Sequence, residues 1–218
     1  DRQRSKLLPV EYFMVTFTLP RELRSLAWHH QTVIYNGLFA VACSTLKDFG
    51  LNPKHLGADI GMTAVLHTHS RRLDYHPHVH VIVPGGGLSP NNTKWVACRS
   101  GFFLPVKVLS RLFRRLFLEG MASLHKAGKL KFFGDLVGLA DPDAFAVHLA
   151  PLRKIEWVVY AKPPFGGPEA VLTYLSRYTH RVAISNHRLV SADADTVAFR
   201  WKDYRIKRGD RMKVMRLP

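Results

Sequence analysis

The sequence predicts an α+β fold in which a mostly antiparallel central sheet is flanked by helices. Three observations predict it: short runs rich in β-branched and aromatic residues, apolar residues at helical spacing elsewhere, and the overall order β-α-β-β-α-β-α-β-β. The 218 residues suit a single domain that spans residues 1–218. With 47% hydrophobic residues, the chain can bury a sizeable core.

The N-terminal half is expected to hold three strands and one long helix. Residues 12–19 (Tyr-Phe-Met-Val-Thr-Phe-Thr-Leu) are typical of a strand, and residues 20–48 follow as a helix with proline in its first turn. Residues 62–67 and 79–83 are predicted to pair as antiparallel strands, because only a short polar segment separates them. The Pro-Gly-Gly-Gly run at 84–87 is expected to end the second strand.

The C-terminal half is expected to alternate helices and short strands. Residues 104–127 carry apolar side chains at helical spacing with arginines between them, which predicts a basic amphipathic helix. A short helix at 142–149, a strand at 155–160 and a helix that begins at Pro168 follow. The last part of the chain is expected to form short strands at 182–185, 196–201 and 212–215.

The charge balance points to a polyanionic partner. Lysine and arginine number 32 against 16 acidic residues, a net charge of +16 with histidine neutral, and nucleic acid is the commonest polyanion. No membrane partner is expected, because the apolar stretch 35–43 is too short to span a bilayer. Two distant cysteines, Cys43 and Cys98, exclude a cysteine-rich zinc site and a disulfide scaffold, and favour a cytoplasmic location.

A histidine pair carries the strongest local signal. In the segment His-Pro-His-Val-His-Val-Ile-Val at 76–83, His78 and His80 are two residues apart and project from one face of a strand. Two imidazoles so placed are a ready pair of metal ligands, although a solvent-facing polar row is the alternative. His67 and His69 lie on the neighbouring predicted strand, so a third ligand is within reach.

A pair of tyrosines carries the second signal. Tyr174 and Tyr178 are four residues apart and therefore share one helix face. Such a pair usually packs against a core. Here Arg177, His180 and Arg181 place phosphate-binding groups at the same end of the helix, which a buried aromatic stripe would not favour.

Together these two motifs resemble the HUH endonucleases, and within them the two-tyrosine rolling-circle transposases of the IS-ninety-one-like and common-region insertion sequences. The resemblance covers nearly the whole chain. It is carried by Leu-Leu-Pro-Val at 7–10, Tyr-Phe at 12–13, Phe-Thr-Leu-Pro at 17–20, Ala-Val-Leu-His-Thr at 64–68, His-Pro-His-Val-His at 76–80, Val-Pro-Gly-Gly-Gly at 83–87, Tyr-Ala-Lys-Pro-Pro-Phe at 160–165 and residues 174–189.

The resemblance implies an HUH-endonuclease-like core and a mechanism. His78, His80 and a third side chain would hold one divalent cation, Mg²⁺ or Mn²⁺, which polarises a scissile phosphate. A tyrosine, Tyr174 or Tyr178, would attack the phosphorus and form a 5′-phosphotyrosine link. The implied partner is single-stranded DNA at the ends of a mobile element, including extruded hairpins.

The same resemblance favours His67 as the third ligand, since it lies in the matching Leu-His-Thr segment. His69 and His76 are the alternatives, and Pro77 suggests that the strand only begins near His76. Phosphate contacts are expected, on charge and proximity, from Arg177, His180, Arg181 and Lys162.

The chain departs from the family pattern in three places. The family leads us to expect a cysteine-rich zinc-binding segment before Leu7 and a further segment after Pro218, so the 218 residues are expected to be a catalytic core. Met14 stands where the family leads us to expect a histidine. Three alternative functions stay open: a plasmid replication initiator or relaxase, a non-catalytic single-strand-binding core, and a hydrolytic zinc enzyme.

Overall fold

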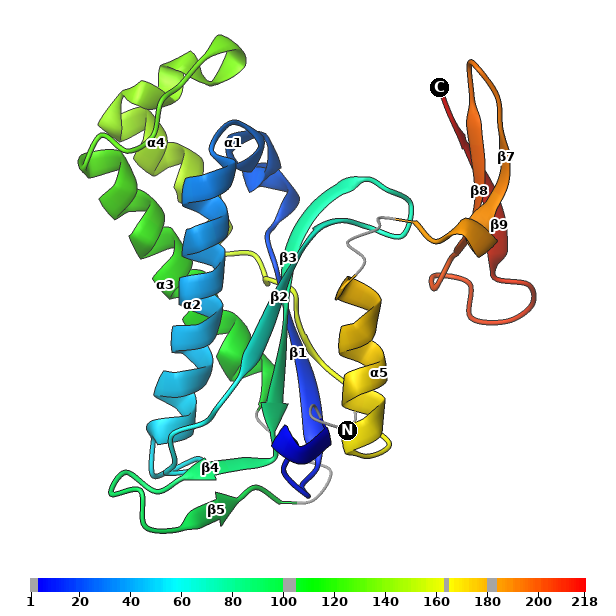
Figure 1. The fold of residues 1–218 in the computed structure, drawn as a ribbon. Coiled ribbons are helices and arrows are strands. Elements are labelled where there is room, and N and C mark those ends of the chain that lie inside the picture. Colours follow the sequence, from blue (N-terminus) through cyan, green and yellow to red (C-terminus); the bar gives the residue numbers. More distant parts are fainter. Residues whose placement is uncertain (1–3, 100–104, 163–164, 180–183) are drawn as a thin grey trace.

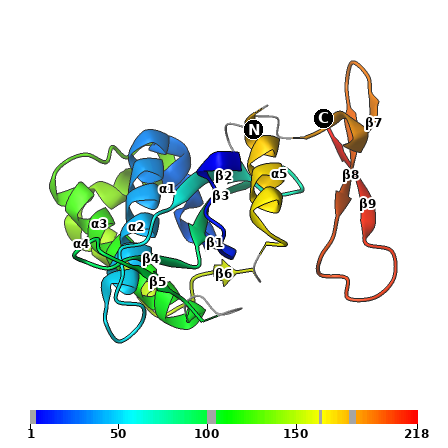
Figure 2. The ribbon, with the colours of Figure 1, turned by 60° about the horizontal axis from the view of Figure 1, so that its bottom comes forward.

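A four-stranded antiparallel sheet forms the centre of the molecule (Figures 1 and 2). The computed structural model describes residues 4–99, 105–162, 165–179 and 184–218, with the backbone alone for 177–179. The strand order is β2-β3-β1-β6, and every pair is antiparallel. These strands are β1 (Tyr12–Thr18), β2 (Thr63–His69), β3 (Tyr75–Pro84) and β6 (Val159–Ala161).

Helices cover both faces of this sheet. In Figure 1, α2 and α3 lie on one face and α5 lies on the other, which confirms the predicted α+β fold with a flanked antiparallel sheet. The helices are α1 (Arg24–His29), α2 (Gln31–Leu51), α3 (Val106–Lys126), α4 (Pro142–Leu149) and α5 (Pro168–Thr179). Short 3₁₀ turns lie at Arg4–Lys6, Arg21–Leu23, Gly134–Ala140, Pro151–Arg153 and Asn186–Arg188.

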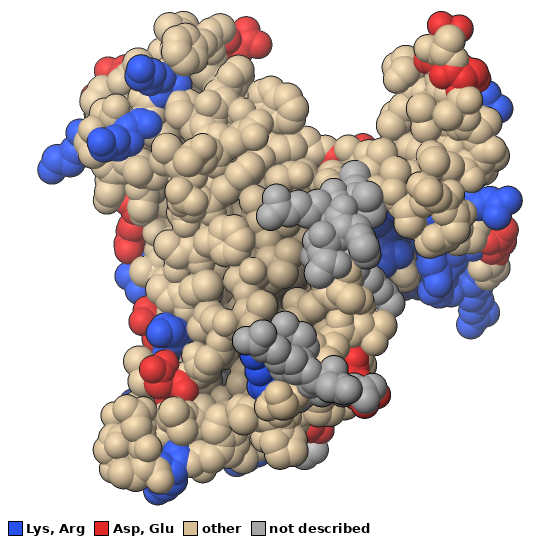
Figure 3. All heavy atoms as spheres, in the orientation of Figure 1, with Lys and Arg blue, Asp and Glu red and all other residues tan. Residues whose placement is uncertain are grey.

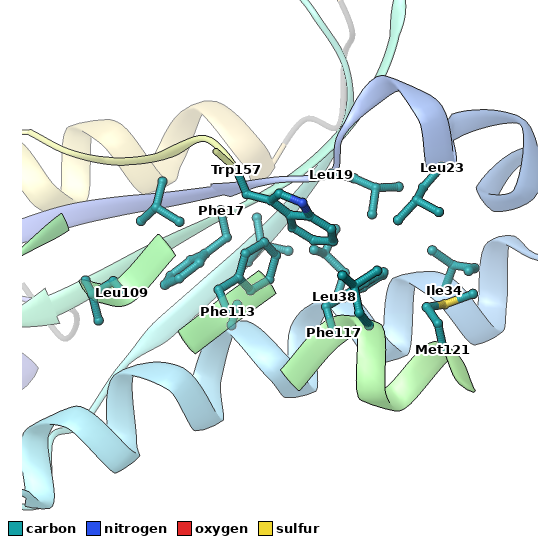
Figure 4. Close-up of a cluster of buried hydrophobic side chains, with 14 of the residues drawn as sticks. Phe17, Leu19, Leu23, Ile34, Leu38, Leu109, Phe113, Phe117, Met121 and Trp157 are labelled. Carbon is teal, nitrogen blue, oxygen red and sulfur yellow. The ribbon is translucent and has the colours of Figure 1, made fainter. Parts of the chain in front are cut away.

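The main core lies between the sheet and helices α2 and α3 (Figure 4). Alternate residues of β1 and β3 point into it, and α3 contributes the apolar stripe that its spacing predicts. The rings of Phe17 and Phe113 lie 5.0 Å apart, and Trp157 meets Phe113 edge-on at 5.4 Å. Aromatic contacts of this kind add to the free energy gained by burying the rings.

The long helix predicted at residues 20–48 is in fact interrupted. It is divided into α1 and α2 at His30, which has φ −127° and ψ 43°. The His30 ring accepts a hydrogen bond from the Lys131 backbone N–H at 2.7 Å, so its other nitrogen donates to the Leu26 carbonyl at 3.0 Å. This side chain therefore ties the end of α1 to a distant loop, an interaction that local periodicity does not reveal.

β3 begins earlier than predicted and runs through Pro77. The register between β2 and β3 shifts between His67 and His69, where one residue of β2 faces two residues of β3, His76 and Pro77. A bulge of this kind removes the need for a backbone N–H at the proline. The expectation that the strand only starts near His76 was therefore wrong. β6 is shorter than the predicted strand at 155–160.

Two short strands were missed at the lower edge of the molecule in Figure 1. β4 (Gly86–Leu88) pairs with β5 (Trp95–Ala97), so the glycine run ends β3 and then continues as a strand. A Cβ atom on Gly87 would lie 2.3 Å from the Asp59 carbonyl oxygen. The missing side chain allows the backbone hydrogen bonds between Asp59 and Leu88 to form.

The C-terminal residues form a separate three-stranded antiparallel sheet, the C-terminal lobe, which stands beside the core in Figure 1. Its strands are β7 (Leu189–Ala192), β8 (Val197–Lys202) and β9 (Met212–Leu217). β8 and β9 agree with the prediction, whereas β7 was missed. Of the strand predicted at 182–185, residues 182–183 lie outside the described residues and residues 184–185 are not in a strand.

Candidate active site

Three histidines meet on the sheet face that carries α5. His67 of β2 lies directly opposite His78 of β3, and His80 follows two residues further along the same strand. One nitrogen of each ring lies within 4.8 Å of those of the other two. Metal–imidazole bonds of about 2.1 Å place two ligand nitrogens at most about 4.2 Å apart, so small side-chain movements would complete a site for one cation.

The hydrogen bond of His78 fits a ligand role. Nδ1 of His78 lies 2.6 Å from the backbone carbonyl oxygen of His76. A carbonyl only accepts hydrogen bonds, so Nδ1 carries the hydrogen and the lone pair of the neutral ring is on Nε2. Metal-binding histidines are commonly held in this way by a carbonyl group.

The protonation state of the three rings also fits. Burial, and then the neighbouring imidazoles, lowers the pKa of His67 to about 4 and that of His80 to about 3. Burial also lowers the pKa of His78, although its bond to the His76 carbonyl opposes the shift. At neutral pH all three rings are uncharged, and a cation binds the neutral form of imidazole.

The two alternative ligands lie outside this group. His69 pairs with Tyr75 on the far side of the bulge. Nδ1 of His76 accepts a hydrogen bond from the guanidinium of Arg24 at 2.5 Å, and burial is the main reason that the pKa of His76 falls to about 4. Arg24, from α1, is a neighbour of the site that sequence reasoning missed, because no local pattern connects it with β3.

Tyr174 reaches the histidine group from α5. Its hydroxyl group is in hydrogen-bonding contact with Nδ1 of His80, and its ring packs edge-on against Phe165 at 5.6 Å. The helix is held on the sheet by a small apolar cluster in which Val171 meets Tyr12 and Ile82. This cluster is separate from the main core, so α5 has its own packing against the sheet.

The other predicted site residues are less well described. Tyr178 lies in α5 one turn after Tyr174, but its side chain and that of Arg177 are outside the described residues, as are His180 and Arg181 altogether. Lys162 follows β6, and its side chain is exposed. Its charge contributes to the lowered pKa of His80, which places it within electrostatic range of the site.

Met14 occupies a buried apolar position on this face. It lies opposite Ile82 in the register of β1 and β3, and only 1% of its surface is exposed. Thr16, two residues further along β1, lies opposite His80. The residue that departs from the family pattern therefore belongs to the apolar layer beside the histidines.

The chain was then compared with known proteins. The family model for Y2 transposases, described as “Putative transposase”, matches residues 61–218. The chain belongs to this family. This match confirms the resemblance to two-tyrosine transposases.

Two curated relatives agree with the family match. “Putative transposase y4qJ” of Sinorhizobium fredii (strain NBRC 101917 / NGR234) is 56% identical over 215 residues, which are 99% of this chain and 54% of that protein. “Transposase for insertion sequence element IS801” of Pseudomonas savastanoi pv. phaseolicola is 35% identical over 86 residues, 39% of this chain and 20% of that protein. This transposase family member therefore spans about half the length of the first relative.

Among solved structures, TrwC complexed with a 27-mer DNA comprising the recognition hairpin and the cleavage site has a TM-score of 0.41 and 17% identity. The similarity covers 56% of this chain and 47% of the other. In the part of the family member that the structure describes, every helix is too short or too polar to cross a membrane.

Proposed function

We propose that this chain cuts and joins single-stranded DNA through a covalent tyrosine–phosphate link, with the help of a divalent cation, Mg²⁺ or Mn²⁺. His67, His78 and His80 would hold the cation, and Tyr174 would attack the DNA. The contact between the Tyr174 hydroxyl and Nδ1 of His80 carries the proposal, because it brings a nucleophile to a group of three neutral imidazoles. A bound cation would neutralise charge on the scissile phosphate.

His80 can prepare Tyr174 for the attack. When Nε2 of His80 faces a cation, Nδ1 carries the ring hydrogen and donates it to the Tyr174 oxygen. This donation favours the phenolate, which an ordinary tyrosine with a pKa of about 10 rarely forms at neutral pH. The positive charge of Lys162 lies close enough to favour the same anion.

The covalent step conserves the energy of the phosphodiester. The Tyr174 oxygen bonds to phosphorus, the bond to the 3′ oxygen breaks, and that oxygen leaves and gains a proton. A 5′-phosphotyrosine remains. Attack by a 3′-hydroxyl on this link reverses the reaction, so joining requires no ATP. We assign a second cleavage to Tyr178, and phosphate contacts to Arg177, His180, Arg181 and Lys162.

The biological role follows from the family. Its relatives are described as transposases, one of them for an insertion sequence. We propose rolling-circle transposition of DNA, with single-stranded element ends and their hairpins as substrates. Such a reaction takes place on chromosomal and plasmid DNA, which places the protein in the cytoplasm at the nucleoid.

The proposal is tested by trapping the covalent link. End-labelled single-stranded DNA carrying candidate element ends is mixed with the protein, with and without Mg²⁺ or Mn²⁺, and run on denaturing gels. We expect a metal-dependent labelled protein band with the wild type that is absent with Tyr174→Phe. Tyr204→Phe is the matched control, since Tyr204 lies in the C-terminal lobe with its side chain exposed and should form the band normally.

Two outcomes would contradict the proposal. Metal-dependent cleavage without a labelled protein band would indicate hydrolysis by a metal-bound water. DNA binding with neither cleavage nor a band, on DNA that a full-length relative cuts, would leave a module that only holds single strands.

A further inference from the structure

We infer that the C-terminal lobe and the turn between β2 and β3 form one surface that holds single-stranded DNA beside the histidine group. This lobe surface is defined by Arg71, Arg200, Lys202, Tyr204 and Arg216. The inference extends the proposed function, because it assigns part of the path of the DNA that Tyr174 would attack.

The lobe is fastened to the hairpin that carries the histidines. The guanidinium of Arg188 donates to the carbonyl oxygen of Arg71 at 2.7 Å and to that of Arg200 at 2.8 Å. The Arg72 guanidinium also lies 5.4 Å from the ring of Trp201, which is buried in the lobe. Because the turn follows directly after β2, a strand held at the lobe surface would lie near His67.

At this junction an exposed aromatic ring lies between two cations. The Arg71 guanidinium is 4.6 Å from the ring centre of Tyr204, and the Lys202 ammonium is 5.3 Å from the same ring. Even so, 56% of Tyr204 is exposed. Aromatic rings flanked by positive charge are a recurring way of binding single strands, since a base stacks on the ring while the cations bind phosphates.

The outer face of β8 and β9 extends the positive surface. Side chains alternate along a strand, so Arg200 and Lys202 share one face of β8. Ala198 lies opposite Arg216, which places Arg216 on that same face. All three cations are exposed. Figure 3 shows Lys and Arg side chains gathered over the lower half of the lobe.

Acidic residues do little to neutralise this face. Residues 184–218 contain nine lysines and arginines against four aspartates. Asp203 is buried, and its carboxylate binds Arg205 and Lys213 rather than a cation of the lobe surface. The charge of Arg71, after burial, also lowers the pKa of Arg188, a sign that like charges repel here. A bound polyanion would relieve this repulsion.

The test compares two variants that each lose three positive charges. Arg71→Ala, Lys202→Ala and Arg216→Ala are combined in one variant. Lys54→Ala, Lys126→Ala and Lys129→Ala, three exposed lysines of the core, are combined in the control. Binding of fluorescently labelled single-stranded DNA is measured by anisotropy at several salt concentrations, and thermal unfolding confirms that both variants fold.

We expect the lobe variant to bind at least about tenfold more weakly, and the control to bind like the wild type. Each lost phosphate contact lowers the slope of log Kd against log salt concentration by about 0.7, so the lobe variant should lose about 2 of that slope. Equal losses in the two variants, or none in either, would overturn the inference. If the triple variant unfolds, Lys202→Ala with Arg216→Ala provides the same comparison against two of the control lysines.

Two further measurements separate this inference from the proposed chemistry. At saturating DNA the lobe variant should still form the labelled band, because Tyr174 and the histidines are unchanged. A wild type that forms no band would refute the chemistry while leaving the binding comparison valid. Polyglutamate that competes as well as DNA of the same charge would show a general polyanion surface and overturn the assignment to DNA.

Discussion

The hydroxyl group of Tyr174 and Nδ1 of His80 are in hydrogen-bonding contact, although 94 residues separate them in the sequence. One side chain comes from a helix and the other from the second strand of the central sheet. Their meeting depends on the small apolar cluster around Val171 that seats α5 on the sheet. The candidate nucleophile and the candidate metal ligands thus come from elements with separate packing.

Metal binding should stabilise the fold. A ligand that binds only the native state at 100 times its Kd adds about 2.7 kcal/mol to the free energy of unfolding. We expect Mn²⁺ to raise the Tm of the wild type, and His67→Ala to remove most of this increase. His29→Ala, which changes an exposed histidine of α1, should respond like the wild type. An unchanged Tm rise in His67→Ala would show that the cation binds elsewhere.

Without metal, stability should fall as the pH is lowered from 7 to 4. The folded-state pKa is about 4 for His67 and about 3 for His80, well below the value of about 6.5 in the unfolded chain. Between these values the unfolded chain binds more protons, so acid favours unfolding. We expect the Tm, measured in EDTA, to decrease across this range. In His67→Gln with His80→Gln the decrease should be smaller, and an equally steep one would contradict the assignment.

Removing one ring from the core should be costly. Phe113 is fully buried and contacts both Phe17 and Trp157. Phe113→Ala should lower the free energy of unfolding by about 3–5 kcal/mol, because it leaves a cavity between sheet and helix. Urea unfolding followed by tryptophan fluorescence measures this change. Phe133→Ala is the control, since 61% of Phe133 is exposed, and it should change stability by less than about 1 kcal/mol.

The close approach at Gly87 gives a test with a matched glycine. Gly87→Ala would place a Cβ atom 2.3 Å from the Asp59 carbonyl oxygen, so the strand must move and lose hydrogen bonds. We expect a loss of about 1–3 kcal/mol in the free energy of unfolding. At Gly61 a Cβ atom would meet nothing within 4 Å, and Gly61→Ala should be nearly neutral. Similar losses in both variants would show that chain flexibility, and not the contact, decides the effect.

Much of the sheet and helix pattern was predictable because it depends on local spacing. The alternation in β3 predicts that His78 and His80 share one face, and the structure places them so. The 3.6-residue spacing of apolar residues predicts α3, whose buried side chains lie along one stripe. Both patterns repeat within a few residues, so each can be recognised in the sequence alone.

The features that were missed depend on distant contacts. Pro77 is tolerated inside β3 because a bulge against β2 removes the need for its N–H. The break at His30 follows from a bond to Lys131, 101 residues away. The bond between Arg24 and His76 is likewise tertiary. The choice of His67 over His69 and His76 as metal ligand came from the family resemblance, and its role stays a prediction.

β3 builds the core with one face and the histidine group with the other. Val79, Val81 and Val83 are fully buried between the sheet and the helices, while His78 and His80 point the opposite way. A shift of β3 by one residue would exchange the two sets and bury imidazoles among hydrocarbon side chains. The apolar packing therefore fixes which residues face the DNA, and a misaligned, inactive site cannot form without first disrupting the interior of the protein.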